Sequence, residues 1–182
     1  MFIEVLIISL LFVKINGGSV KELEKIHIKG WKLILIGFII QILSFFFIVL
    51  INGELENWYG RIHLITYLLI TIVLLYNIEY KGFKLMAMGN IMNGIAMIFN
   101  NGKMPVYIGA LNMPGLERQK ALLKSGELLT HSLVDRSFPM FFFADIISIP
   151  KPYIVPKVIS IGDISLALGI IIFIIRYSRK NN

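Results

Sequence analysis

Two aspartates lie inside apolar stretches of the sequence, where an acidic side chain has few partners. Asp145 interrupts an apolar run at residues 138–149, and Asp163 lies one turn inside a second run that continues to residue 176. Acidic residues inside a membrane are functional candidates, because hydrocarbon offers a charge no solvation. The structural alternative for each is a helix cap or a hydrogen-bond or ion-pair partner of a basic residue. Both alternatives stay open from the sequence.

Asparagine and glycine gather on one face of a third apolar run, at residues 85–99. Asn90, Asn93 and Gly94 share this face, and Asn101 follows just beyond its end. In membrane helices these residue types permit close helix contacts and hydrogen bonds between helices. The alternative is a face that lines a site for a ligand or an ion.

The polar side chains named above lie in or next to long apolar stretches of sequence that have almost no charged residues. About 20 apolar residues cross a hydrocarbon slab about 30 Å thick. The sequence is 57% hydrophobic, with a mean hydropathy of +0.77, which exceeds the range of ordinary soluble domains. We therefore predict one all-α integral membrane domain, a polytopic transmembrane helical bundle of about five spans. The predicted spans are residues 1–15, 31–51, 60–79, 85–99 and 158–176.

The first span is the shortest and has a rival interpretation as a signal peptide. In such a peptide the positive residues precede the apolar core. Here Glu4 comes first and the lysines follow, from Lys14 onward. The pattern favours an uncleaved first helix.

Residues 100–157 form the longest polar stretch and have internal organisation. Leucines alternate with charged residues over 116–133, which predicts an amphipathic helix on the membrane surface. The apolar run at 138–149 is too short to cross a bilayer, so we predict a re-entrant or interfacial segment.

The basic residues alternate between connections and predict the orientation. The connection at residues 14–32 has five lysines, the acidic connection at 52–57 has no basic residue, and residues 81–84 have two lysines. Basic residues favour the cytoplasmic side, so the N-terminus and residues 100–157 are predicted outside and the C-terminus inside. The net charge of +7 is attributed to this bias, and nucleic acid is not a predicted partner.

The remaining chemical inventory argues against cofactor chemistry. The chain has no cysteine, and its three histidines have no metal-ligand spacing. It also lacks a phosphate-binding glycine loop and a nucleophile elbow. We therefore predict no cofactor and no metal ion.

Several short elements together resemble a known family. They are Asn90-x-x-Asn93, Asn101-Gly102-Lys103-Met104-Pro105-Val106, Ala144-Asp145 and Ser160-x-Gly162-Asp163. The chain resembles a family of small bacterial membrane proteins that is catalogued only as a domain of unknown function. This resemblance implies a bacterial cell membrane location and a single helical domain, and it carries no activity.

A second resemblance is local and concerns the lipoprotein signal peptidases, which are membrane aspartyl proteases. Leu133-Val134-Asp135-Arg136 is similar to the element of their first catalytic aspartate, and Gly162-Asp163 with Gly169 to that of the second. It implies a pair of carboxylates that share a proton, Asp163 with Asp135 or with Asp145. The family's asparagine three residues before each aspartate is replaced here by Ser132 and Ser160.

We predict a polar cluster at the outer end of the bundle. Its members are Asn90, Asn93, Asn101, Gly102, Met104, Pro105, Asp145, Gly162 and Asp163. The favoured function is non-enzymatic: besides the lipid bilayer, the protein would contact a protein partner or a second copy, a lipid headgroup or a small ligand. Aspartyl protease activity is the alternative. A complete ion pathway is disfavoured, because the polar faces lie mainly in the outer half.

Overall fold

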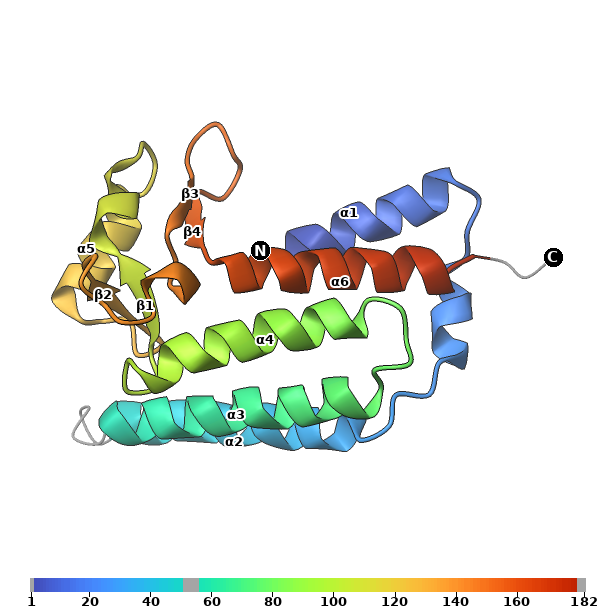
Figure 1. Cartoon of the computed structure of the whole chain (residues 1–182), viewed down its shortest axis with the longest axis horizontal. Helices are drawn as coiled ribbons and strands as arrows, with labels where there is room; N and C mark the ends of the chain where they lie inside the picture. Colours follow the sequence, from blue (N-terminus) through green and yellow to red (C-terminus); the bar gives the residue numbers. More distant parts are fainter. Residues whose placement is uncertain (1, 51–55, 180–182) are drawn as a thin grey trace.

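The structure, a computed structural model, describes residues 2–50 and 56–179. Its main feature is a set of long helices packed in the order α1–α6–α4–α3–α2 (Figure 1). Their bounds are α1 Phe2–Ile15, α2 Trp31–Leu50, α3 Glu56–Tyr76, α4 Phe83–Ile98 and α6 Ile161–Tyr177. Every predicted span is thus helical over most of its length. Most of the acidic connection at 52–57, residue 51 and the tail beyond 179 lie outside the described residues.

Two of these helices are long and apolar enough to cross a membrane. They are α2, over Trp31–Ile48, and α3, over Trp58–Tyr76. Helix α2 leaves large apolar side chains exposed, among them Leu43 at 63% and Phe46 at 60%. Helices α1, α4 and α6 are apolar but shorter, with 14, 16 and 17 residues. Length and hydropathy therefore support two candidate spans of the five predicted.

The connections predicted to share one side of a membrane meet at one end of the bundle. The backbone N–H of Ser19, in the first connection, donates to the carbonyl of Ser178 after α6. The N–H of Lys29 donates to the side-chain oxygen of Asn77 at 2.7 Å, and the Asn77 amide donates back to the Lys29 carbonyl. This buried asparagine joins the first connection to the end of α3.

Residues 100–159 contain four short strands, so the all-α prediction was wrong for this segment. β1 (Met104–Tyr107) pairs in parallel with β2 (His131–Val134), and β3 (Ile147–Ile149) pairs antiparallel with β4 (Lys157–Ile159). The strands lie at the end of the helices opposite the C-terminus (Figure 1). We call residues 100–159 the cap segment. A small apolar core holds it together: Val106, Ala110, Leu111, Leu116, Leu123 and Val158.

The amphipathic helix of the cap segment is shorter than predicted. Helix α5 covers Glu117–Ser125 and ends at Gly126, whose φ of +76° is left-handed. A glycine in this conformation commonly ends a helix. The chain then turns into β2, so Leu133 belongs to a strand and Leu129 to the connection before it, rather than to the predicted helix at 116–133.

The apolar run at residues 138–149 lies in the cap segment and is not a membrane helix. It contains the 3-10 turn η3 (Phe141–Phe143) and the strand β3. Main-chain hydrogen bonds join Asp145, between them, to Pro105 and Tyr107 of β1. The prediction that this run does not cross a bilayer agrees with this arrangement, although its strand pairing was not foreseen.

Candidate functional site

Glycines bring the backbones of α4 and α6 into direct contact. A Cβ atom on Gly89 would lie 2.3 Å from the carbonyl oxygen of Gly162, and one on Gly82 would lie 2.2 Å from that of Gly169. Seven residues separate the glycines on each helix, so the antiparallel helices meet twice on one face. This close approach, typical of small-residue interfaces, brings Asn93 to the first turn of α6.

A buried hydrogen-bond network forms where Asn93 meets the start of α6. The Asn93 amide donates to Oδ1 of Asp163 at 2.9 Å, and the Ser160 hydroxyl donates to Oδ1 of Asn93 at 2.8 Å. Asn93 and Ser160 are 1% and 0% exposed. These three side chains therefore tie α4 to the start of α6.

The same residues fix the start of α6. The Asp163 N–H donates to the Ser160 hydroxyl at 2.9 Å, and the Ser160 N–H donates to the Asp163 carboxylate at 3.3 Å, which makes a capping box. The span predicted from residue 158 therefore begins as a helix only at Ile161. The three residues before Ser160 form β4 instead.

Replacing Ser160 by alanine is expected to lower the free energy of unfolding by about 1–2 kcal/mol. The change removes the helix cap and leaves the Asn93 oxygen without its donor. The thermal midpoint of the purified protein in detergent is the measurement. Ser125→Ala, at an exposed hydroxyl at the end of α5, is the control and should change the midpoint little. Equal midpoints for both variants would contradict the assigned network.

Asp145 is the least satisfied polar side chain of the site. Its side chain is 4% exposed, and its Oδ1 atom is buried without a hydrogen-bond partner among the described residues. Its backbone is held by β1, because its N–H donates to the Pro105 carbonyl and its carbonyl accepts from the Tyr107 N–H. A buried acceptor without a donor costs about 1–3 kcal/mol, so the Asp145 side chain lowers the stability of the folded chain.

Asp145 and Asp163 act on each other electrostatically. Burial raises the pKa of Asp145 well above its ordinary value, and the charge of Asp163 raises it further. The hydroxyl of Tyr67, on α3, lies within electrostatic reach of both carboxylates. The site therefore draws an acid from the cap segment, an acid from α6 and a phenol from α3 into one region.

Asn90 belongs to the helix contact between α3 and α4. Its amide donates to the Tyr67 carbonyl at 2.8 Å and to the Thr71 hydroxyl at 2.7 Å. These bonds match the structural alternative considered from the sequence, in which asparagine joins helices. One turn separates Asn90 from Asn93, so the two asparagines bind different neighbours of α4.

Asn101 and Gly102 form the tight turn that follows α4. Both have a positive φ, +53° and +82°. A Cβ on Gly102 would lie 2.1 Å from the Gly60 carbonyl oxygen, so this position requires glycine. The Gly102 carbonyl contacts Nδ1 of His63 at 3.2 Å. Gly102 therefore anchors the cap segment to α3, whereas the Asn101 side chain is exposed.

Met104 and Pro105 are buried in β1 and support the site through packing and through the Pro105 carbonyl. The neighbouring strand carries His131, whose Nδ1 lies 2.7 Å from the Thr130 hydroxyl. Burial, together with the smaller effect of nearby His63, lowers the pKa of His131 to about 4. His131 is therefore a neutral group at pH 7.

Asp135 lies in a different environment from the other two aspartates. It is exposed after β2, and its Oδ1 accepts hydrogen bonds from the Ser137 N–H and hydroxyl at 2.8 and 2.5 Å. These bonds lower the pKa of Asp135. Its carboxylate is thus ionised and occupied within a local turn.

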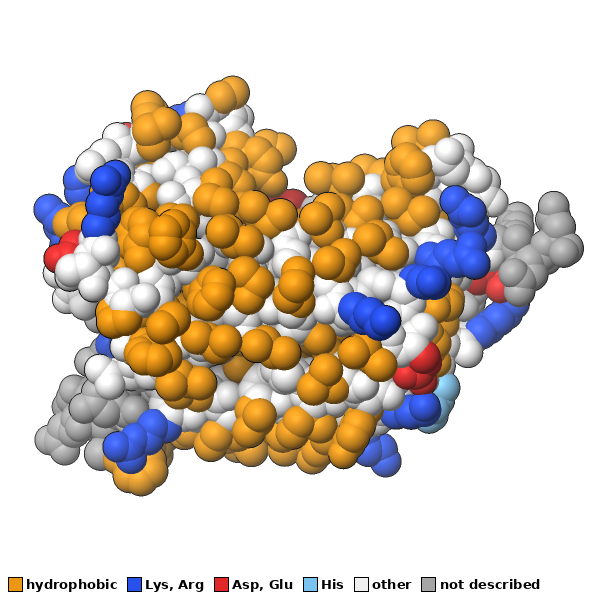
Figure 2. Space-filling view, viewed as in Figure 1, with side chains coloured by type: hydrophobic (Ala, Val, Ile, Leu, Met, Phe, Trp, Pro, Cys, Tyr) orange, Lys and Arg blue, Asp and Glu red, His pale blue; other side chains and the backbone are white. Residues whose placement is uncertain are grey.

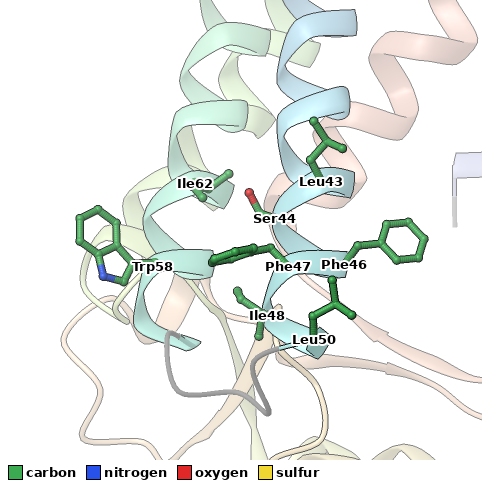
Figure 3. A pocket seen from close by; sticks show the side chains of 8 residues that line it. All are labelled: Leu43, Ser44, Phe46, Phe47, Ile48, Leu50, Trp58 and Ile62. Carbon is green, nitrogen blue, oxygen red and sulfur yellow. The ribbon is translucent and has the colours of Figure 1, made fainter.

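An apolar groove of about 620 Å³ lies between α2 and α3. Phe47 points from α2 toward α3 and Trp58 lies on the α3 side (Figure 3). The one polar side chain in its lining, Ser44, donates to the Ile40 carbonyl. The Arg61 guanidinium stacks on Trp58 at 5.1 Å. Among the described residues, the lining of the groove offers apolar contact and no titratable side chain.

Sequence reasoning missed several partners of the site. Ser160 was noticed as part of a motif but not as a member of the cluster, although the spacing Ser-x-x-Asp is a signal for a capping box. Tyr67 and His63 carried no such signal, because an aromatic residue in an apolar helix usually packs. Only the folding of the cap segment onto α3 brings them to the site.

Comparison with known protein families identifies the family of the chain. The model of a family of unknown function, DUF5317, matches residues 25–175. The chain belongs to the DUF5317 family. Within the described residues, all the aspartates and asparagines of the site fall inside the match, so they belong to the part of the chain that the family model covers.

A relative of the chain comes from Thermotoga maritima and is named only as an uncharacterized protein. It is 29% identical over 175 residues, which cover 96% of this chain and 90% of the relative. No solved structure matches the chain. The site of this DUF5317 chain has two carboxylates that interact electrostatically, and one of them has an acceptor oxygen without a partner among the described residues.

Proposed function

We propose that the protein is a bacterial plasma-membrane protein of about five spans, with its N-terminus outside and its C-terminus in the cytoplasm. We further propose that it is not an enzyme and binds a small ligand at the outer membrane face, through Asn93, Asp145 and Asp163. The cap segment would then be a lid of protein over the outer end of the helices, with the two carboxylates beneath it.

Support for membrane insertion comes from the surface of the helices. Hydrophobic side chains cover the helical part of the face shown in Figure 2, and charged side chains gather toward its ends. Trp31 and Trp58 start α2 and α3 at opposite ends and are both about half exposed. Tryptophan prefers the membrane interface, and an exposed apolar surface of this extent is unfavourable in water.

Support for the orientation comes from the end at which the connections meet. The lysine-rich first connection, the turn after α3 and the end of α6 are hydrogen-bonded neighbours. Basic residues near short connections favour the cytoplasm. The cap segment lies at the opposite end, and so on the outer side in this proposal.

The single observation that carries the ligand proposal is the buried, unpartnered Oδ1 atom of Asp145 beside Asp163. Native mass spectrometry of the full chain, released from its native membrane, is the test. We expect an added mass on the wild-type protein that Asp145→Asn loses and that Asp135→Asn keeps. The same adducts on all three proteins would overturn the proposal.

The aspartyl protease remains the second candidate, because Asp145 and Asp163 are a coupled pair of acids. In such enzymes one carboxylate holds the shared proton while the other activates water. Cleavage of a lipopeptide by the wild-type protein, lost in both Asp145→Asn and Asp163→Asn, would favour this candidate. Absence of cleavage, or cleavage that both variants retain, would exclude it.

A further inference from the structure

We infer that the ligand of the Asp145–Asp163 pair is a compact monovalent cation, either an alkali-metal ion or a primary ammonium group. This inference rests on the proposed function, because it names the class of ligand for the same site. Three features of the site lead to it: its two acids, its free acceptor atom and its burial.

The site has two acidic side chains and no basic side chain paired with either of them among the described residues. In the part of the chain that the structure describes, neither Asp145 nor Asp163 forms an ion pair with a basic side chain. The described ion pairs are elsewhere: Lys25 with Glu22, Lys29 with Glu79 and Lys157 with Glu4. Buried charges in proteins are usually paired or bind a cation. A bound cation would supply the missing partner.

The donors of Asn93 and Ser160 are already in use. The Asn93 amide and the Ser160 N–H both donate to Asp163, and the Ser160 hydroxyl donates to Asn93. None of these donates to Oδ1 of Asp145, which remains a buried acceptor without a partner. A ligand that either coordinates oxygen or carries N–H donors would satisfy this atom. Alkali-metal ions and ammonium groups do one or the other.

The burial of Asp145 limits the size of the ligand, and the number of acids limits its charge. Asp145 is 4% exposed, so only a small atom or group can reach Oδ1. The raised pKa of Asp145 means that the pair readily keeps one proton, which leaves one negative charge for a cation to balance. Among the described residues no group of three or more His, Cys, Asp or Glu side chains could hold a metal ion, and such groups are typical of tightly bound divalent metals.

Thermal unfolding of the full chain in detergent tests the inference. The buffer cation is N-methylglucamine, which is too bulky for the site. Sodium, potassium and methylammonium chloride are compared at equal ionic strength. We expect at least one of them to raise the unfolding temperature by about 5 °C at saturation. A sodium or potassium effect identifies an alkali-metal site, and an effect of methylammonium alone identifies an ammonium site.

Two variants make the test specific. Asp145→Asn should remove the shift, and Glu127→Gln, at an exposed acid after α5, should keep it. No shift with any cation, or an equal shift in Asp145→Asn, would overturn the inference. Equilibrium dialysis of the wild-type protein with radiolabelled sodium and methylammonium does not depend on the variants, and zero bound cation per chain would also overturn it. A native ligand that depends on Asp145 but is not a cation would defeat this inference and leave the proposed function standing.

Discussion

Replacing Gly89 by alanine is expected to destabilise the protein by about 1–3 kcal/mol. The new Cβ atom would lie 2.3 Å from the Gly162 carbonyl oxygen and 2.8 Å from the Leu166 nitrogen, which are backbone atoms and cannot turn aside. Helices α4 and α6 must then separate, and overpacking of this kind costs about 1–3 kcal/mol. The separation would also lengthen the bond between Asn93 and Asp163. The thermal midpoint in detergent measures the change.

Gly94→Ala is the matched control, because it makes the same substitution on the same helix. A Cβ atom on Gly94 would meet no atom within 4 Å. Alanine is about 1 kcal/mol better than glycine inside a helix, so this variant should be as stable as the wild type or more stable. Two variants of equal stability would show that α4 and α6 do not touch at Gly89.

The helices were predictable from the sequence because long apolar runs have one structural solution in a membrane. Residues 31–51 and 85–99 became α2 and α4 with shifts of only one or two residues at each end. The helix contact was partly predictable as well, since Gly162 and Gly169 were recognised with Asp163. The contacts of these two glycines with Gly82 and Gly89 could not be predicted, because the spacing of residues on one helix does not show which helix packs against it.

The cap segment was predicted poorly for physical reasons. Strands of three or four residues are too short for an alternating pattern, so β2 and β3 were taken for parts of a helix and of an interfacial segment. The position of Asp145 depends on main-chain bonds to β1, some 40 residues earlier in the chain. Asp145 was recognised as a candidate because it is an acidic residue in an apolar run. Its electrostatic interaction with Asp163 could be found only from the folded structure.

Replacing Asp145 by asparagine is expected to stabilise the ligand-free protein at pH 7.5 by about 1–3 kcal/mol. Asparagine has nearly the same shape and carries no charge, so the cost of burying an acid with an unsatisfied oxygen is reduced. Residues that serve binding often lower stability in this way. Thermal midpoints of the wild type and the variant, both in N-methylglucamine buffer, measure the difference.

The pH dependence of that difference has a defined sign. The folded-state pKa of Asp145 is raised above 3.8, its ordinary value, by burial and by Asp163. Below about pH 3.8 the Asp145 carboxyl is protonated in both the folded and the unfolded chain, so its ionisation does not affect stability. As the pH rises toward the folded pKa, the unfolded state loses its proton first and the wild type loses stability. The gap between the variant and the wild type should therefore open above about pH 4. A variant less stable than the wild type throughout would contradict this assignment.

The side of the membrane on which the cap segment lies is tested most directly by cysteine labelling. The chain has no cysteine, so a single introduced thiol gives the only signal. Ser125→Cys lies in the cap segment and Asn16→Cys in the first connection, and both positions are exposed. In right-side-out membrane vesicles, a membrane-impermeant maleimide should label Ser125→Cys at once and Asn16→Cys only after detergent is added. Equal labelling of both in sealed vesicles, or recovery of the protein in the soluble fraction, would contradict a membrane protein whose acidic site faces outward.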